Sequence, residues 1–294
     1  MKTYLECIPC ILSHAIHVSR MADCTTEEQK EILDQVALQI PDFSLNNTPP
    51  EMAGVIQKLV KEKTNNEDPY LELKEHSSLE VKKQLPEISK IINDAEDSFF
   101  TALKLAIAGN IIDYGANNNL DIKSELFHIL ENFDKKLEHE SKDLFNYDAF
   151  LERLASSNTL LYIGDNVGEH FFDKLFIEQI KLKFPTIQIK YAYRDVPILN
   201  DINRKDVIEA EIDKVAEIMS SGSQLPGTLL KKCSEQFLNE FKNADIIIAK
   251  GQGNYETLSE ADGPVFFLLM AKCQIIANHA NCKLKDLLLI KNFD

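Results

Sequence analysis

The sequence predicts an α/β fold in which a helical N-terminal region precedes a Rossmann-like α/β/α domain with a mainly parallel sheet. Two observations support this fold class. In residues 25–40 and 51–64, apolar side chains recur at helical spacing. From residue 159 onward, short apolar runs alternate with helical segments at the spacing of βαβ units. We therefore place the helical region at residues 1–150 and the α/β domain at residues 151–294.

Start and stop signals delimit the helices of the first half. Thr25 stands before two glutamates at the start of one predicted helix, and Pro41 ends it. Pro49 and Pro50 suit the first turn of the next helix. The apolar-periodic tract over residues 71–115 predicts two further helices, separated near Pro86.

The second half contains four predicted strands, at residues 159–164, 187–193, 245–250 and 264–272, the last of these being the final strand. Residues 204–219 are interpreted as one helix, and residues 273–280 as the closing helix. The segment GQGN at residues 251–254 is interpreted as a glycine loop. These strands alternate with helices, which indicates a sheet covered on both faces.

The composition is that of a globular protein with an acidic surface. The chain has 294 residues, 44% of them hydrophobic, and a formal net charge of −15. This charge repels nucleic acid and anionic lipid, so neither is an expected partner. No apolar run is long enough to cross a bilayer, and the first 15 residues, which include Glu6, lack the apolar core of a signal peptide. We therefore expect a cytoplasmic protein with reduced thiols; its oligomeric state is open.

Polar residues cluster in three turns that follow predicted strands. In a parallel sheet, ligands bind beyond the carboxyl ends of the strands, so these turns are the candidate site. The clusters are Asp165 and Asn166 in the first turn; Arg194, Asp195, Asn200 and Asp201 in the second; and Lys250, Gly251, Gly253, Asn254 and Glu256 in the third.

Asp165, Asn166 and Asp201 offer the carboxylate and amide oxygens that hard divalent cations prefer. Lys250 would offset the remaining charge of a phosphate. These parts suit phosphoryl transfer, with Asp165 and Asp201 as the catalytic carboxylates. Attack by water and attack by the Asp165 carboxylate both fit the pattern. Each residue taken alone is also an ordinary turn or helix-cap residue.

Cys7 and Cys10 form a CxxC pair in the helical half, followed by His14 and His17. A zinc or redox site is conceivable, but the spacing is not that of a zinc finger and no second CxxC exists. We interpret the pair as structural, lying away from the strand-end turns. The two cysteines are therefore predicted to be dispensable for the chemistry.

Seven segments, CIPC, TPPEMAG, EDPYLELKEHS, AIAGNIIDYG, GDNVGE, VPILND and KGQGNYETL, occur in an order that resembles the damage-control phosphatases, in particular compact microbial members with an N-terminal CxxC. The resemblance implies hydrolysis of small phosphomonoesters, such as sugar phosphates or related damaged metabolites, with Mn²⁺, Ni²⁺, Co²⁺ or Mg²⁺. A small phosphorylated metabolite is thus the expected partner.

The resemblance also implies roles for particular residues. Asp165, Asn166 and Asp201 would bind the metal, and Lys250 and Asn110 would reach the phosphate. We further expect Glu169, Arg194 and Asn254 at the phosphate.

One residue departs from the family pattern. His170 follows GDNVGE where an apolar residue is expected, and we interpret it as a solvated histidine on a helix face.

Two alternatives come from other functional classes: an adenosylmethionine-dependent methyltransferase and a non-catalytic protein that binds a small ligand. The turn GDNVGE lacks the usual glycine spacing of the first, and the joint presence of Asp165, Asn166, Asp201 and Lys250 argues against the second. Phosphate release with added Mn²⁺ separates the phosphatase from both.

Overall fold

The computed structural model describes residues 1–109, 130, 133 and 144–293. Its helices are α1 (Cys7–Met21), α2 (Thr26–Gln39), α3 (Pro49–Thr64), α4 (Leu71–Asp94), α5 (Ser98–Ala108), α7 (Tyr147–Ala155), α8 (His170–Lys183), α9 (Arg204–Glu209), α10 (Glu235–Asn243), α11 (Gly251–Leu258) and α12 (Gln274–His279). Its strands are β1 (Thr159–Ile163), β2 (Gln188–Tyr193), β3 (Glu217–Ser220), β4 (Ile246–Lys250), β5 (Val265–Met270) and β6 (Leu287–Lys291). Single 3₁₀ turns occur at Ile40–Asp42, Ile212–Lys214 and Leu230–Lys232.

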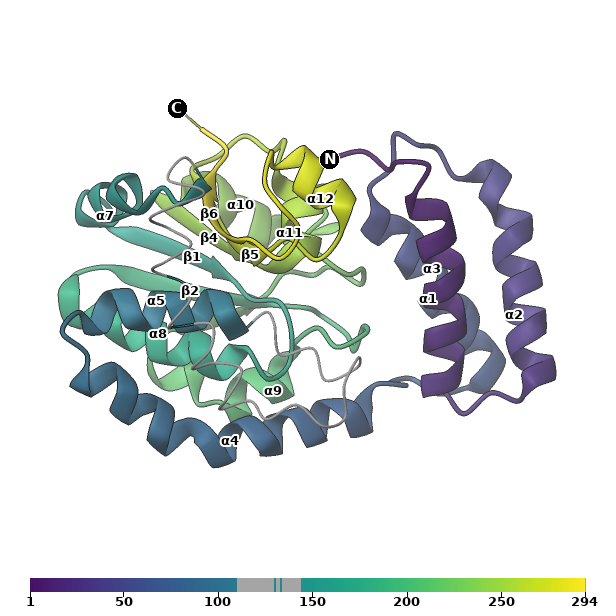
Figure 1. Cartoon of the computed structure of the whole chain (residues 1–294), viewed down its shortest axis with the longest axis horizontal. Coiled ribbons are helices and arrows are strands. Elements are labelled where there is room, and N and C mark those ends of the chain that lie inside the picture. The colour runs from purple at the N-terminus through teal and green to yellow at the C-terminus, as the bar shows by residue number, and fades with distance from the viewer. Residues whose placement is uncertain (110–129, 131–132, 134–143, 294) are drawn as a thin grey trace.

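The strands form one six-stranded sheet in the order β3-β2-β1-β4-β5-β6. All neighbouring pairs are parallel except β5 and β6, which are antiparallel. This is the strand order of doubly wound α/β sheets, in which the chain reverses direction across the sheet between β1 and β4. The predicted mixed α/β fold with a mainly parallel sheet is therefore confirmed (Figure 1).

Alternating side chains of each strand enter two cores on opposite faces of the sheet. Leu160 and Tyr162 of β1 belong to the core shared with α4, α5, α7 and α8. Leu161 and Ile163 belong to the core shared with α10, α11 and α12. A strand buried on both faces has a nearly continuous apolar sequence, which is why β1 could be predicted as a strand from its sequence.

Helices α1, α2 and α3 form a separate group at one end of the molecule, with their own core (Figure 1). Ile11, Val18, Ile32, Met52 and Ile56 are among its buried residues. Helices α4 and α5, by contrast, pack in the core of the sheet. The division of the chain at residue 150 stays a prediction.

Local sequence sets several helix starts. Thr25 accepts a hydrogen bond from the backbone of Glu28, whose carboxylate accepts one from the Thr25 N–H, which makes a capping box. Asn203 and Asp206 form the same motif at the start of α9. Pro49 occupies the first turn of α3, where its missing N–H is not needed.

Three element predictions were wrong. Helix α4 runs without interruption through Pro86, because Val81, Ile88 and Ile92 on both sides of the proline are buried in the sheet core. Tertiary packing there outweighs the hydrogen bond that proline removes. The predicted helix over residues 204–219 ends at Glu209, and residues 217–220 form β3. The segment GQGN is not a loop but the first turn of α11.

The last strand was also missed. Residues 264–272 do contain β5, but β6 follows at Leu287–Lys291 and pairs antiparallel with it. A run of four apolar residues, Leu287 to Ile290, is ambiguous on its own, and only the neighbouring strand makes it part of a sheet. No helix among the described residues is both long and apolar enough to cross a membrane.

Candidate active site

The turns after β1, β2 and β4 meet at one edge of the sheet. Ile163 near the end of β1 pairs in register with Ala192 of β2 and with Ala249 of β4. The three polar clusters that follow these strands therefore lie together, next to the point where the sheet changes direction. This is where ligands bind in doubly wound sheets.

Backbone hydrogen bonds hold Asp165, Asn166 and Asp201 side by side. Asn166 and Asp201 form an isolated antiparallel bridge between the first two turns. The N–H of Ile202 donates to the carbonyl of Asp165 at 2.9 Å, and the N–H of Val167 donates to that of Asn200 at 2.8 Å. The structure thus brings together the three predicted metal ligands from two strand ends.

The two carboxylates lie in an environment that disfavours their charge. Asp165 is 6% exposed and Asp201 is 4% exposed. Burial raises the pKa of Asp165 well above its usual value, and the neighbouring carboxylates of Glu169 and Asp201 raise it further. Burial also raises the pKa of Asp201, although the Arg194 guanidinium opposes this shift. A bound cation would stabilise the ionised forms of Asp165 and Asp201 and so lower the pKa of both.

The donor atoms fit a hard divalent cation. They are two carboxylates and the side-chain oxygen of Asn166, whose amide nitrogen already donates to Asp165 Oδ2 and Glu169 Oε1, each at 2.8 Å. Within the described part of the chain, no three His, Cys, Asp or Glu side chains are gathered as a ready metal cluster. A metal site here would therefore need the side-chain oxygen of Asn166 in addition to the carboxylates of Asp165 and Asp201.

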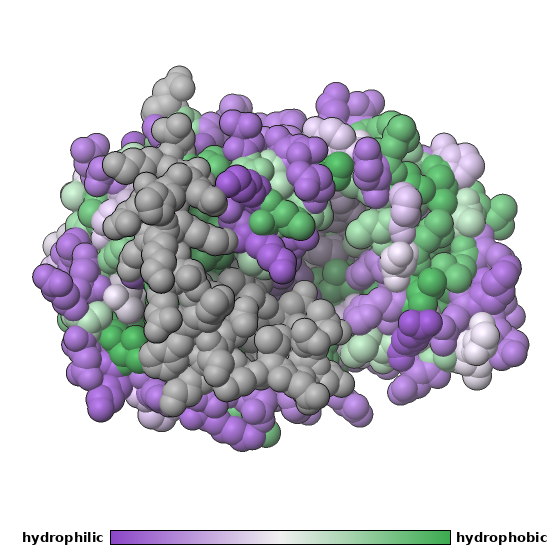
Figure 2. Space-filling model, in the orientation of Figure 1, coloured by the Kyte–Doolittle hydropathy of each residue, from purple (hydrophilic) through white to green (hydrophobic). Residues whose placement is uncertain are grey.

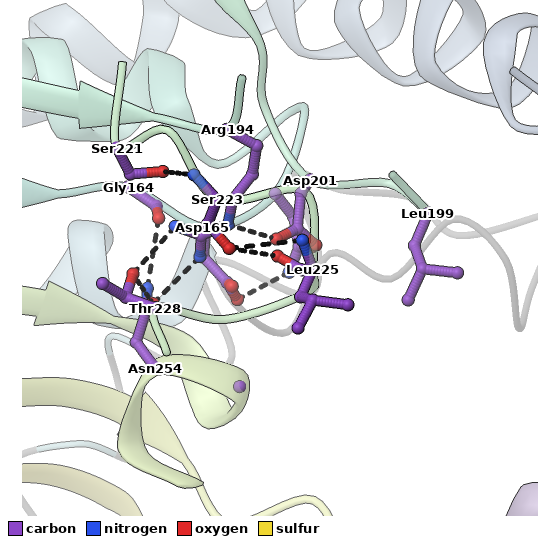
Figure 3. A network of polar contacts seen from close by, with 12 residues as sticks. Gly164, Asp165, Arg194, Leu199, Asp201, Ser221, Ser223, Leu225, Thr228 and Asn254 are labelled. Carbon is purple, nitrogen blue, oxygen red and sulfur yellow. Dashed lines mark hydrogen bonds and ion pairs between the residues drawn. The ribbon is translucent and has the colours of Figure 1, made fainter. Parts of the chain in front are cut away.

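Arg194 and Asn254 lie behind the carboxylates and form a buried hydrogen-bond network (Figure 3). Arg194 donates from Nε to Asp201 Oδ2 at 2.8 Å, from Nη1 to Thr228 Oγ1 at 2.9 Å and from Nη2 to Asn254 Oδ1 at 2.9 Å. Asn254 in turn donates to the carbonyls of Gly164 and Lys250, at 3.1 and 2.7 Å. This network joins all three turns and fixes the position of the Asp201 carboxylate.

Lys250 lies in a second network, away from the cavity wall. Its side chain is 0% exposed, and Nζ donates to Glu169 Oε2 at 3.0 Å and to Asp173 Oδ1 at 2.7 Å. Asp173 also accepts from the hydroxyls of Tyr162 and Tyr191, at 2.7 and 2.8 Å. Burial opposes the charge of Lys250, but Asp173 and Glu169 together raise its pKa above the usual value. The two carboxylates therefore already compensate this cation.

A cavity of about 590 Å³ opens beside Asp165 and Asp201. In the space-filling view the surface is hollowed between the α1–α3 group and the rest of the molecule (Figure 2). The cavity is lined by both parts: Glu6, Cys7, Cys10, Ile11, His14, Pro49, Pro50 and Ala53 on the helical side, and Asp165, Asn166, Asp201, Gln252, Gly253, Glu256, Lys272 and Cys273 among those on the sheet side.

Lys272 was missed by the reasoning from sequence. It is the only lysine or arginine among the described residues that line the cavity. Its charge reaches the site, since it lowers the pKa of Asp165 against the effect of burial. Lys272 follows β5 at the same sheet edge, so the strand-end rule applied to that strand would have identified it.

The predicted position of the CxxC pair was wrong. Cys7 and Cys10 do not lie away from the strand-end turns, because they line the same cavity as Asp165 and Asp201. The reason is that α1 packs with its first turn toward the sheet edge, a placement that no local pattern encodes. Whether the pair is dispensable for the chemistry stays a prediction.

The interpretation of His170 as solvated was also wrong. His170 is 0% exposed, and its Nδ1 accepts a hydrogen bond from the N–H of Gly168 at 3.0 Å. Burial lowers its pKa to about 3, so the ring is neutral. Asn110 lies outside the described residues, although the preceding Gly109 packs against Glu169 and Phe172 at the start of α8.

Fold and site together define a doubly wound α/β protein with an oxygen-rich acidic site at the strand ends. Residues 3–288 match the model of the damage-control phosphatase ARMT1-like domain, and the chain belongs to this family. The family resemblance noted in the sequence is thereby confirmed.

Individual relatives agree with this assignment. The chain is 34% identical to the damage-control phosphatase PH1575 of Pyrococcus horikoshii, over 99% of both chains. It is 28% identical to a damage-control phosphatase of Archaeoglobus fulgidus, over 98% of both. The crystal structure of the P. horikoshii protein, described as a DUF89 family member, superposes with a TM-score of 0.87 at 29% identity over 100% of both chains. These relatives support a phosphatase, and nothing favours the methyltransferase or the non-catalytic alternative.

Proposed function

We propose that this protein hydrolyses small phosphomonoester metabolites with the help of a divalent metal ion held by Asp165, Asn166 and Asp201. The observation that carries the proposal is the pair of buried carboxylates on the wall of a cavity, where burial raises the pKa of both. When bound, the ion supplies Lewis-acid stabilisation of the phosphoryl group. Oxygen ligands admit Mg²⁺ and Mn²⁺, and the family resemblance adds Ni²⁺ and Co²⁺.

The protein's own residues divide the remaining tasks. Lys272 lies on the cavity wall near Asp165 and balances the charge of a bound phosphate. Arg194 and Asn254 hold the Asp201 carboxylate in place from behind. Glu169 links the site to Lys250, since its two oxygens accept from Asn166 and from Lys250. Lys250 is thus assigned to positioning Glu169.

The cavity lining offers groups that can form hydrogen bonds with a hydroxyl-bearing organic part. Its described lining has no Phe, Tyr or Trp on which a nucleobase could stack, but it presents the polar side chains of Gln252, Glu256, Gln274 and Asn278. Amide and carboxylate groups pair well with hydroxyls. A sugar phosphate or a related damaged metabolite is therefore the substrate class that we propose; the names of the relatives support the phosphatase activity alone.

A phosphatase screen over a panel of phosphorylated metabolites tests the proposal. The protein is treated exhaustively with a chelator and then assayed with Mn²⁺, Ni²⁺, Co²⁺ or Mg²⁺ added singly. We expect no phosphate release after chelation and restored release with at least one ion, with sugar phosphates hydrolysed faster than nucleotides. Full activity after chelation would overturn the metal site.

A further inference from the structure

Three thiols from two distant parts of the sequence converge on the cavity. Cys7 and Cys10 are the first and fourth residues of α1, and Cys273 directly precedes α12. We call these three residues the thiol cluster. Burial raises the pKa of Cys7 and of Cys10, and the nearby groups Cys273 and Glu256 raise both further. Cys273 is therefore close enough to Cys7 and Cys10 to influence their ionisation.

The thiol cluster is open to small reagents. Cys10 is exposed, while Cys7 and Cys273 are partly buried, and none of them is in a disulfide. Because their ionised forms are disfavoured, Cys7 and Cys10 rest as protonated thiols near neutral pH. Their oxidation should accordingly accelerate as the pH rises.

Cys7 and Cys10 are placed so that a disulfide can join them. Residues three apart on a helix have Cβ atoms about 5–6 Å apart, slightly more than the ~3.5–4.5 Å of a disulfide. The difference must be taken up by the backbone. These residues occupy the first turn of α1, where the N–H groups have no partners within the helix and the turn can adjust most easily.

A change in this turn would reach the rest of the cavity. The segment before α1 is anchored at its other end, because the amino group of Met1 donates to the carbonyl of Glu256 at 2.6 Å and to Ser259 Oγ at 3.1 Å. Glu256 itself lines the cavity, as does Glu6. Contraction of the first turn would therefore pull on one end of a short segment whose other end is fixed at Glu256, which lines the cavity.

We propose that oxidation of Cys10 and Cys7 to a disulfide reversibly weakens substrate binding, so that the thiol cluster is a redox-sensitive site in the cavity wall. This inference rests on the proposed phosphatase function. The oxidant is a peroxide. The Cys10 thiolate attacks one peroxide oxygen, which yields a sulfenic acid and, after protonation, water. The Cys7 thiol then attacks the sulfenic sulfur, which forms the disulfide and releases a second water. Two thiols are oxidised and one hydrogen peroxide is reduced.

The experiment oxidises the metal-free protein with hydrogen peroxide, removes the oxidant, adds Mn²⁺ and assays p-nitrophenyl phosphate. For the wild type we expect KM to rise by about tenfold or more, since small misplacements in a binding wall have effects of this size, with recovery after a thiol reductant. Cys10→Ser and Cys7→Ser should each lose the sensitivity to peroxide, measured as the ratio of KM after and before oxidation of the same variant. Cys273→Ser and Cys282→Ser serve as matched controls and should stay sensitive; Cys282 lies outside the cavity.

Peptide mass spectrometry reads out the disulfide without any substrate. A Cys7–Cys10 bond together with an unchanged KM would overturn the inference. So would loss of sensitivity in Cys273→Ser, which would indicate a bond across the cavity. If Cys10→Ser does not fold, Cys10→Ala replaces it. A reduced wild type with no activity on any phosphomonoester would refute the proposed function instead, while the mass spectrum would still report whether the bond forms.

Discussion

Two charged clusters meet at the same sheet edge, and they are built in opposite ways. Around Lys250, one buried cation contacts the carboxylates of Glu169 and Asp173 at 3.0 and 2.7 Å, and two tyrosines complete the network. Around Asp165, the strongest influences after burial are two further carboxylates, Glu169 and Asp201. The first cluster is closed within the protein, whereas the second lies on a cavity wall.

The difference shows how a cluster of charged residues that binds a ligand can be distinguished from one that only holds neighbouring residues in place. A buried charge whose partners are all within the protein, such as that of Lys250, fixes the positions of those partners. Buried carboxylates that lie near one another raise one another's pKa, and a bound cation, as we propose for this site, would favour their ionised forms. Glu169 belongs to both clusters, because it accepts hydrogen bonds from Asn166 and from Lys250. The Lys250 cluster can therefore hold the residues around Asp165 in position.

The largest expected effect comes from Asp165→Asn. The change keeps the shape of the side chain but removes one charge from the proposed metal site, so kcat should fall by at least about a hundredfold. Because the ionised Asp165 is disfavoured in the metal-free protein, the same variant should be no less stable to urea than the wild type without metal. Turnover and urea unfolding measure the two effects. If the variant keeps near wild-type turnover, Asp165 is an ordinary turn residue and does not take part in catalysis.

Lys250→Met tests the closed cluster. The variant leaves two buried carboxylates without their cation, which should lower the free energy of unfolding by about 3–5 kcal/mol. Lys272→Met is the matched control on the cavity wall: its stability should stay near that of the wild type while KM for a phosphomonoester rises by about tenfold. Equal loss of stability in both variants would contradict the contrast between the two clusters.

The smallest expected effect concerns Glu256, another residue that lines the cavity. Burial raises the pKa of Glu256 to about 7, partly offset by the hydrogen bond from Gln252. The pKa of Glu256 in the folded protein lies above its usual value of 4.5. The contribution of Glu256 to stability is therefore complete below pH 4.5 and is lost as the pH rises from 4.5 to about 7. Its size is at most about 3 kcal/mol.

Glu256→Gln should remove this dependence. Urea unfolding measured at about pH 5 and about pH 8 should show a smaller decline for the variant than for the wild type, with the variant more stable at the higher pH. An unchanged decline would mean that other groups set the pH dependence.

Much of the site could be predicted because its elements carry local signals. The strand before Asp165 is a nearly continuous apolar run, the strand before Arg194 is apolar apart from Gln188 and Lys190, and each is followed at once by its polar turn. Parallel pairing then brings such turns together whatever the rest of the chain does. The capping boxes at Thr25 and Asn203 are likewise readable, since each depends on residues only three apart.

Other features depended on contacts between distant segments. The sequence presents Lys250 and Lys272 alike, as lysines at strand ends, and only the fold buries the first between two carboxylates and places the second on a cavity. The strand β3 lies in a segment whose apolar spacing resembles a helix, and β6 follows the predicted last strand, so both were recognised only from the strands that pair with them.

The sequence by itself determined the α/β class, the acidic strand-end turns and the family. Tertiary structure decided which cation faces the cavity, that α4 continues through Pro86, and that Cys7 and Cys10 reach the wall opposite Asp165. The physical reason is the range of the interactions. Periodicity, caps and turns arise from residues within a few positions of one another, whereas burial, ion pairing and cavity walls arise from surfaces that meet only after the chain has folded.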